Sequence, residues 1–390
     1  MLGSVENVEN GSTETNFMGM QNYKLSPMER LRMVACSSIF GEPSYYSDST
    51  KSYVNRNISN YLLFQDLNAE DTVSLFTKVI DEALDFDYEA TINFALSLRK
   101  EFMMRLNPSV ILVRAALHPS RAKFNESHPK VFREIVCDVV QRPDDITNQL
   151  NYYKQLKGGK QNLPNVLKRA WAEKLEKTSR YQLKKYLNRG NLIDLVRICH
   201  ANSTDIDEMM KSGDLVVKAD ENTWESLRSQ GKTWEEIVNT IRIPHMALLR
   251  NLRGIAKEIG DGDKIEILMK LLQEGVKGGK QFPFRYYSAY KAVKSSNDID
   301  ASVKQIIEDG LDKCMTISME NFPTLTGKTI SLCDNSGSAW GTFNSQYGSV
   351  TVATIANLSG IMTAINSDEG EVGIFGDRLE TRSIKKDCNI

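Results

Sequence analysis

The sequence is poor in the residues that build metal centres, disulfide frameworks and membrane spans. Its 390 residues include six cysteines, without a Cys-x-x-Cys pair, and four histidines, without a His-Glu-x-x-His motif. Neither a zinc enzyme nor a disulfide framework is therefore predicted, and with no signal peptide we expect reduced thiols in the cytoplasm. No apolar run reaches the ~18 residues that cross a bilayer. The best candidate, residues 350–365, is interrupted by threonine, asparagine and serine and predicts a buried helix.

Catalytic motifs are also missing. Ser336 lies in Asp-Asn-Ser-Gly-Ser, which lacks the Gly-x-Ser-x-Gly elbow of serine hydrolases. Gly327-Lys328-Thr329 is not a phosphate-binding loop, because Phe322 occupies the position of the first glycine and the expected strand follows the motif instead of preceding it. No residue set positions a water or a leaving group, so a nuclease is the weakest hypothesis and no enzyme is predicted.

One long segment carries most of the positive charge. Residues 151–190 contain eleven lysines and arginines but only Glu173 and Glu176 as acids, in a chain whose net charge is −1. Tyrosines and a tryptophan are interleaved with the basic residues. A charge run alone is usually a solvated helix face, but basic residues mixed with aromatic ones are typical of a polyanion surface and indicate nucleic acid as the partner.

Helical periodicity dominates the chain from residue 25 to about residue 319. Residues 1–20 are polar and aperiodic, and we expect them to form a disordered tail. The repeated helical segments with short turns predict a mainly α fold of stacked hairpins, an α-solenoid. Two buried stripes illustrate the pattern: Leu167, Ala170, Trp171 and Leu175, then Leu192, Leu195, Val196 and Cys199.

The character of the sequence changes near residue 323. A strand ending at Cys333, a helix over about 349–366 and strands over 371–375 and 380–384 predict the start of an α/β unit. Only 52 residues follow Ser338, so we expect an incomplete domain.

A candidate cation site follows the first of these strands. Asp334, Ser336 and Ser338 supply hard oxygen ligands of the kind that Mg²⁺ or Mn²⁺ prefers. A polar turn with a capping function is the alternative interpretation of the same residues. Three ligands from one loop rarely hold a hard cation alone, so the predicted site is incomplete.

Two helices carry further candidate cations. On the helix 191–200, Arg197 and His200 are predicted to share a flank beside the buried stripe, where His200 is either a packed histidine or an RNA contact. On the helix 244–259, Arg250, Arg253 and Lys257 are predicted to lie opposite the apolar side.

Several segments together resemble the TROVE-module family, the Ro ribonucleoprotein autoantigens and their bacterial orthologues. The most specific is Pro244-His245-Met246-Ala247-Leu248-Leu249-Arg250-Asn251-Leu252, similar to the family's Pro-x-x-Ala-Leu-Leu-Arg-Asn-Leu motif. The others are Leu167 to Trp171, Tyr186 to His200, Phe282 to Tyr286, and Gly327 to Ser338, which resembles the start of a von Willebrand factor A domain.

The resemblance implies a HEAT-like α-solenoid ring, the TROVE module, over residues 21–320, and the N-terminal part of an α/β von Willebrand factor A domain over 325–390. It implies partners too: small non-coding (Y-like) RNA, misfolded or single-stranded RNA, and an exoribonuclease such as polynucleotide phosphorylase. The RNA-contacting positions would be Lys185, Arg189 and His200, with Lys168 and Arg169 on the adjoining helix. Asp334, Ser336 and Ser338 match the metal-ion-dependent adhesion motif of A domains.

Two hypotheses follow. The first is a non-enzymatic RNA-binding ribonucleoprotein scaffold, whose candidate contacts are Lys168, Arg169, Lys185, Arg189, Arg197, His200 and Arg250. The second is a protein-interaction scaffold that uses a cation-dependent A domain without RNA, because helical solenoids are often protein binders.

Overall fold

The computed structural model describes residues 13–15, 21–23, 25–36, 72–157, 162–187, 191–216, 223–337, 339–340 and 351–384. Contacts within the chain divide it into two compact units. We call them the N-terminal unit, residues 7–221, and the C-terminal unit, residues 222–390. The helices predicted as one module over 21–320 therefore belong to both units.

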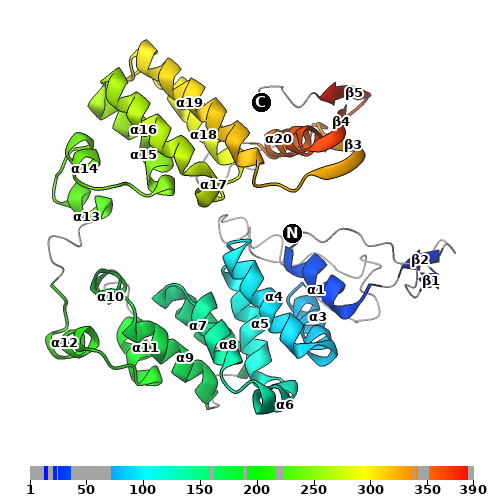
Figure 1. Ribbon diagram of the computed structural model, residues 1–390, viewed down its shortest axis with the longest axis vertical. Helices are drawn as coiled ribbons and strands as arrows, with labels where there is room; N and C mark the ends of the chain where they lie inside the picture. Colours follow the sequence, from blue (N-terminus) through cyan, green and yellow to red (C-terminus); the bar gives the residue numbers. More distant parts are fainter. Residues whose placement is uncertain are drawn as a thin grey trace. The chain divides into compact units, whose positions relative to one another are not determined.

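The N-terminal unit is a stack of short helices (Figure 1). They are α1 (Pro27–Cys36), α3 (Thr72–Phe86), α4 (Tyr88–Lys100), α5 (Leu106–Leu117), α6 (Ser120–Ser127), α7 (Val131–Val139), α8 (Pro143–Lys157), α9 (Asn165–Glu176), α10 (Arg180–Leu187), α11 (Leu192–Cys199) and α12 (Thr204–Ser212). Helices α4, α7, α9 and α11 pack in succession, while α5 packs on α8 and α8 on α10 and α11. These two rows confirm the predicted solenoid arrangement.

A short antiparallel pair precedes α1. It consists of β1 (Thr13–Thr15) and β2 (Gln21–Tyr23). Strand β1 lies inside the segment 1–20 that composition predicts to be disordered, so the structure differs from the expectation at residues 13–15.

The core of the N-terminal unit contains both predicted stripes. Every residue of the stripes on α9 and α11 is buried, and Trp171 is fully buried. The indole N–H of Trp171 donates to Oε1 of Gln149 at 2.7 Å, so its one polar atom is satisfied inside the core. Helical spacing was a reliable guide here because it depends on local geometry alone.

The C-terminal unit begins with a second group of helices. They are α13 (Trp224–Ser229), α14 (Trp234–Thr240), α15 (His245–Ile259), α16 (Gly262–Glu274), α17 (Val276–Gly279), α18 (Pro283–Lys294) and α19 (Ala301–Met319). Helix α19 packs on both α16 and α18, and α15 packs on α16 and α18. Leu252, Ile255, Tyr286, Ile307 and Leu311 are fully buried at these contacts.

The first residue of α15 is held by an unusually close contact. A Cβ added at Gly275 would lie 2.6 Å from Nδ1 of His245, and one added at Gly279 would lie 2.5 Å from its Cδ2. On the other side, Nε2 of His245 lies 2.8 Å from the hydroxyl of Tyr286. His245 is therefore a packing residue, and it explains why small residues stand at the end of α16 and in α17.

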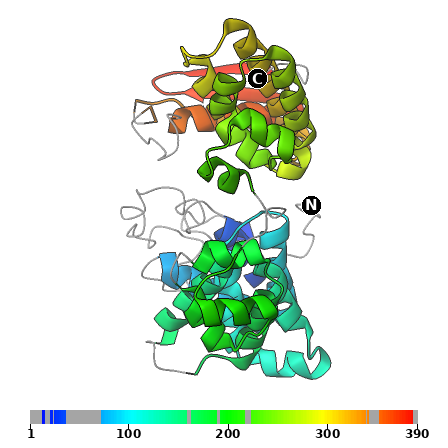
Figure 2. The ribbon, with the colours of Figure 1, turned by 90° about the vertical axis from the view of Figure 1, so that its left-hand side faces the viewer.

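A three-stranded sheet with one helix completes the C-terminal unit (Figure 2). Strand β3 (Leu325–Asp334) pairs in parallel with β4 (Ser367–Phe375), and β4 pairs antiparallel with β5 (Leu379–Ile384). Helix α20 (Val352–Ile365) joins β3 to β4 and packs on both. The predicted strand–helix–strand unit is confirmed, and residues 352–365 of the interrupted apolar stretch form the helix α20.

Strand β3 begins earlier than predicted. Gly327, Lys328 and Thr329 lie inside the strand instead of before it. Gly327 has a φ of 83°, and the register of β3 on β4 shifts between Leu325 and Lys328. A glycine in this left-handed conformation is the usual residue at such an irregularity, which explains its place in the strand.

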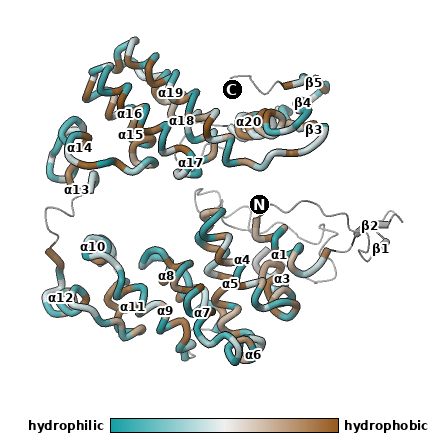
Figure 3. The backbone as a smooth tube through the Cα atoms, viewed as in Figure 1, coloured by the Kyte–Doolittle hydropathy of each residue, from teal (hydrophilic) through white to brown (hydrophobic). Residues whose placement is uncertain are grey.

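Hydrophobic and hydrophilic residues alternate along the helices of both units, as expected for amphipathic helices (Figure 3). Among the residues described, no helix is long and apolar enough to cross a membrane.

Candidate nucleic-acid interface

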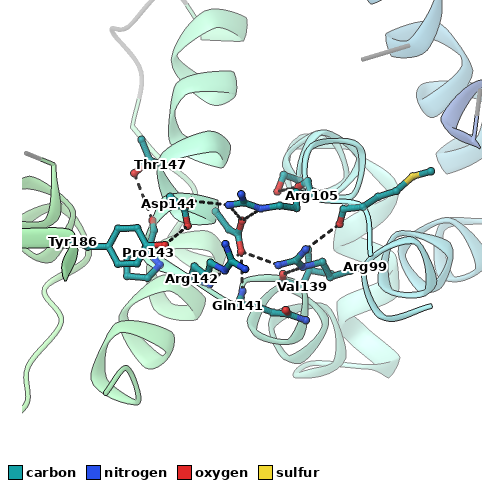
Figure 4. A network of polar contacts seen from close by, with 12 residues as sticks. Arg99, Arg105, Val139, Gln141, Arg142, Pro143, Asp144, Thr147 and Tyr186 are labelled. Carbon is teal, nitrogen blue, oxygen red and sulfur yellow. Dashed lines mark hydrogen bonds and ion pairs between the residues drawn. The ribbon is translucent and has the colours of Figure 1, made fainter. Parts of the chain in front are cut away.

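A buried ionic network lies at the start of α8, and Tyr186 joins the basic helix α10 to it (Figure 4). The carboxylate of Asp145, which is 1% exposed, accepts from Arg99 at 3.2 Å and from Arg105 at 2.8 Å. It also accepts the backbone N–H groups of Gln141 and Arg142, both at 3.1 Å. A buried carboxylate with this many donors is well satisfied and fixes the entry of α8.

The same network reaches α10 through Asp144. Its carboxylate accepts from Arg105 at 2.7 Å and from the hydroxyl of Tyr186 at 3.1 Å. Burial alone would raise the pKa of Asp144, but the hydrogen bonds and charge of Arg105, with the Tyr186 hydroxyl, outweigh it and hold the pKa below its usual value. Tyr186 thereby fixes the basic helix α10 to α8.

Part of the basic run is neutralised by acids. Lys177 pairs with Glu173 at 2.8 Å. Arg180 pairs with Asp205 at 2.7 Å and with Glu208, both on α12. Lys184 also has a partner, Asp214, at 3.5 Å. Arg180 and Lys184 join α10 to α12 and the residue Asp214 after it, so the run is not one continuous binding face as its charge count suggests.

Lys168 and Arg169 on α9 differ from that group. Within the described part of the chain neither forms an ion pair; Arg169 is exposed and Lys168 is half-buried. Burial raises the pKa of the Cys199 thiol to about 12, and the positive charge of Lys168 partly opposes this rise. Lys168 therefore lies close to the C-terminal end of α11.

Arg197 and His200 belong to that end of α11. Both are exposed, and among the residues that the structure covers neither has an ion-pair partner. His200 ends the helix with a φ of 57° and a ψ of 37°, its N–H donating to the carbonyl of Val196. The helical spacing that placed Arg197 and His200 on one flank therefore does not extend to His200. As an exposed residue, His200 is not the packed histidine of the alternative interpretation.

Of the predicted contacts, the structure places Lys168 near Cys199, at the end of the helix that carries Arg197. Lys168, Arg169, Arg197 and His200, which we call the basic face, come from α9 and the end of α11. Lys185 lies nearby in sequence on α10, with its ammonium 6.0 Å from the centre of the Tyr181 ring. Arg189 lies outside the described residues. These two positions stay predictions.

A small cavity of about 150 Å³ lies beside Tyr186, where α8, α10 and α11 meet. Its polar lining comes from Asp144, Thr147, Asn148 and Asn191. The cavity places hydrogen-bonding side chains and an aromatic ring next to one another on the unit that carries the basic face.

Arg250 belongs to the C-terminal unit, on α15. Of the three cations predicted for this helix, Lys257 and Arg253 share Asp298, at 2.7 Å and 3.8 Å. Arg250 is exposed and has no ion pair within the range that the structure describes. Of the three cations predicted for this face, Arg250 is therefore the one that has no carboxylate partner among the described residues.

The candidate cation site lies at the end of β3. Asp334 Oδ1 accepts the N–H of Ser336 at 2.9 Å. Hydrogen bonds from the Ser336 side chain and backbone hold the pKa of Asp334 below its usual value, so the carboxylate is charged at neutral pH. An ionised carboxylate beside a hydroxyl fits a hard cation in kind. Ser338 lies outside the described residues, and among those described no group of three His, Cys, Asp or Glu side chains gathers around a common point.

Aromatic residues of α18 are a feature that the sequence-based prediction of site residues missed. Phe284, Tyr287 and Tyr290 recur at intervals of three, and Lys291 and Lys294 follow two of them at i+4. This combined spacing of rings and cations is visible in the sequence, but it involves far fewer charges than the basic run.

Comparison with known proteins gives three findings. Residues 216–308 match the family model of the TROVE domain. Mouse telomerase protein component 1 is 34% identical over 77 residues, which cover 18% of this chain and 3% of that protein. The crystal structure of the Deinococcus radiodurans Ro (RSR) protein matches with a TM-score of 0.54 and 14% identity, over 80% of this chain and 71% of that one.

The comparisons confirm the resemblance to the TROVE-module family and the fold. The TROVE match does not cover the whole chain. It includes helices α13 to α18 and the first part of α19, whereas the residues of the basic face precede it. The chain spans only a small part of the curated relative's length.

Proposed function

We propose that the chain is a non-enzymatic RNA-binding scaffold of a cytoplasmic ribonucleoprotein. Its ligands are small non-coding, Y-like RNA and the single-stranded ends of misfolded or decaying RNA, and an exoribonuclease such as polynucleotide phosphorylase is a further partner. The TROVE match over 216–308 and the fold shared with a Ro protein support this proposal.

The observation that carries the proposal is the contrast between paired and unpaired cations. Arg180 and Lys184 face carboxylates on or just after α12, whereas Lys168, Arg169 and Arg197 have no carboxylate partner among the described residues. A cation that neutralises no acid of its own protein binds a phosphate without first losing an ion pair. Release of counterions from the RNA then makes the affinity depend on salt.

The test replaces Lys168, Arg169 and Arg197 together with glutamine. RNA affinity should fall, and the slope of log K against log salt should decrease in magnitude by about 0.7–0.9 for each phosphate that the protein no longer neutralises, so by roughly 2–3. The measurement is a gel-shift titration of a small structured RNA at several salt concentrations.

A matched control removes the same charge from ion-paired positions. The control variant carries Lys177→Gln, Lys232→Gln and Lys270→Gln, whose ammonium groups lie 2.7–2.9 Å from a glutamate one turn away. Its salt slope should match that of the wild type. If both triple variants lose affinity equally, only the net charge matters and the basic face is not the binding surface.

We also propose that Asp334, Ser336 and Ser338 contribute ligands to a divalent cation, Mg²⁺ or Mn²⁺. The charged state of Asp334 supports this. The site serves the rival function as well, a protein-interaction scaffold without RNA. The absorbance ratio of protein purified without nuclease separates the two functions: RNA of defined size favours the ribonucleoprotein, and a clean protein spectrum favours the rival.

A further inference from the structure

Helix α18 presents a face on which cations stand beside aromatic rings. The guanidinium of Arg285 lies 5.6 Å from the ring centre of Phe284. The ammonium of Lys291 lies 5.8 Å from the ring centre of Tyr287, and that of Lys294 lies 5.1 Å from the ring centre of Tyr290. The twelve residues of α18 include no acid.

These residues form a continuous strip. Positions three, four and seven apart share a helix face, so Phe284, Tyr287, Tyr290, Lys291 and Lys294 lie on one side of α18. The strip is about 15 Å long at 1.5 Å per residue. Tyr286 and Val293 of the same helix are buried in the core. Within the strip, Lys291 and Lys294 are exposed, whereas Tyr287 and Tyr290 are partly buried and pack against the core.

An aromatic cavity lies at the N-terminal end of the strip. Phe282 is stacked on Phe284 with ring centres 5.4 Å apart, and its ring centre lies 5.9 Å from that of Phe322. These rings, with Thr363 and Asn366 of the α20 end, line a cavity of about 220 Å³. That volume is below the roughly 300–1,000 Å³ of sites for drug-sized ligands, so it suits a single small planar group.

Exposure argues that the aromatic cluster is more than core packing. The side chain of Phe282 is 55% exposed, although a stacked and apolar ring is usually covered. The charged groups of the strip itself are all cationic, and the charge of Glu308 on α19 acts on Lys294. Rings flanked by cations match the two parts of a nucleotide, because a base stacks on a ring and its phosphate meets the cation.

We propose that the α18 strip and the Phe282 cavity form a binding track for single-stranded RNA, separate from the basic face. An unpaired terminal base enters the cavity that Phe282 and Phe322 line, and the following nucleotides run along Tyr287 and Tyr290 with their phosphates toward Lys291 and Lys294. Duplex RNA is excluded from this track because its bases are already stacked and paired. The track rests on the proposed RNA binding and assigns the single-stranded ligand to named residues.

The experiment compares two ring variants of the full-length protein. The first carries Tyr287→Leu and Tyr290→Leu, which keeps apolar volume at two partly buried positions but removes the rings. The second carries Tyr287→Phe and Tyr290→Phe, which keeps the rings. The probes are a fluorescein-labelled uridine oligomer and a blunt-ended RNA hairpin, followed by fluorescence anisotropy.

The leucine variant should bind the oligomer on the order of tenfold more weakly for each ring removed, while the phenylalanine variant binds it as the wild type does. Hairpin affinity should not change in either variant. Phe282→Ala, a change at an exposed position, should also weaken only the oligomer. In a Lys291→Gln, Lys294→Gln variant the oligomer's salt slope should decrease in magnitude by about 1.4.

Unchanged oligomer binding by the leucine variant and by Phe282→Ala would overturn the track while leaving the proposed function intact. Equal loss of oligomer and hairpin would also overturn it, because the track is selective for single strands. If the wild type binds neither probe, the proposed function itself fails. If an aromatic peptide binds at the cavity and the oligomer does not compete with it, the strip is a protein-docking surface instead.

Discussion

Replacing Asp145 with asparagine tests whether the buried network at the start of α8 stabilises the N-terminal unit. The carboxylate faces the guanidinium groups of Arg99 and Arg105 from an almost fully buried position. Removing one partner of a buried ion pair costs about 3–5 kcal/mol, because a charge is left without its counterion.

The structure places the expected loss at the lower end of that range. Arg105 keeps Asp144, at 2.7 Å, so its charge is still paired. Arg99 keeps the carbonyl of Val139 at 3.1 Å but loses the negative charge of Asp145. We expect the free energy of unfolding of the N-terminal unit to fall by about 3 kcal/mol.

Hydrogen exchange followed by mass spectrometry is the suitable assay, because it reports on the two units separately. Peptides from α4 to α8 should exchange faster in the Asp145→Asn variant, while peptides from α15 to α19 serve as an internal reference. The control is Asp138→Asn, which breaks an exposed pair with Lys100 and should cost no more than about 1 kcal/mol. Equal protection in the two variants would refute the view that the buried network carries this stability.

Three further predictions concern the C-terminal unit. Burial lowers the pKa of His245, so the unfolded chain takes up a proton near pH 6.5 that the folded chain does not. The free energy of unfolding should therefore be highest above that pH and fall as the pH drops through it. Urea midpoints at pH 7.5 and 5.5 would reveal this difference, and His245→Gln should remove it. Tyr286→Phe leaves Nε2 of His245 without its partner and should lower the free energy of unfolding by about 1–3 kcal/mol in urea titrations, whereas an unchanged midpoint would mean that the hydrogen bond does not matter. Asp334→Asn should weaken Mn²⁺ binding measured by electron paramagnetic resonance, and equal binding by the variant would place the cation elsewhere.

Local regularities of the sequence predicted the architecture well. The stripes of α9 and α11 and the strand–helix–strand order after residue 323 follow from periodicities of 3.6 and 2, which act over a few residues. The predicted start of β3 was wrong because a glycine before a strand usually belongs to a turn. Gly327 instead lies inside β3, at the point where the register on β4 shifts.

Tertiary pairing was the part that the sequence could not supply. Arg180 looks like its neighbours in the basic run, yet Asp205 and Glu208 reach it from α12, about 25 residues further along the chain. His245 likewise reads as a polar residue of a motif, and only the approach of Gly275 and Gly279 identifies it as packing.

A surface that binds RNA is therefore better located by the absence of acidic side chains than by the number of basic side chains. In the run 151–190, Arg180 and Lys184 are matched by carboxylates on α12 or just after it, whereas Lys168 and Arg169 of α9 have no ion-pair partner among the described residues, and the same holds for Arg197 at the end of α11. Helix α18 contributes only three cations beside its rings, but it has no acid. Phosphate contacts give affinity without regard to strandedness, whereas stacking requires an unpaired base. Two surfaces that differ in this way would bind different parts of an RNA. The affinity for structured RNA should therefore depend on α9 and α11, and the affinity for single-stranded ends on α18.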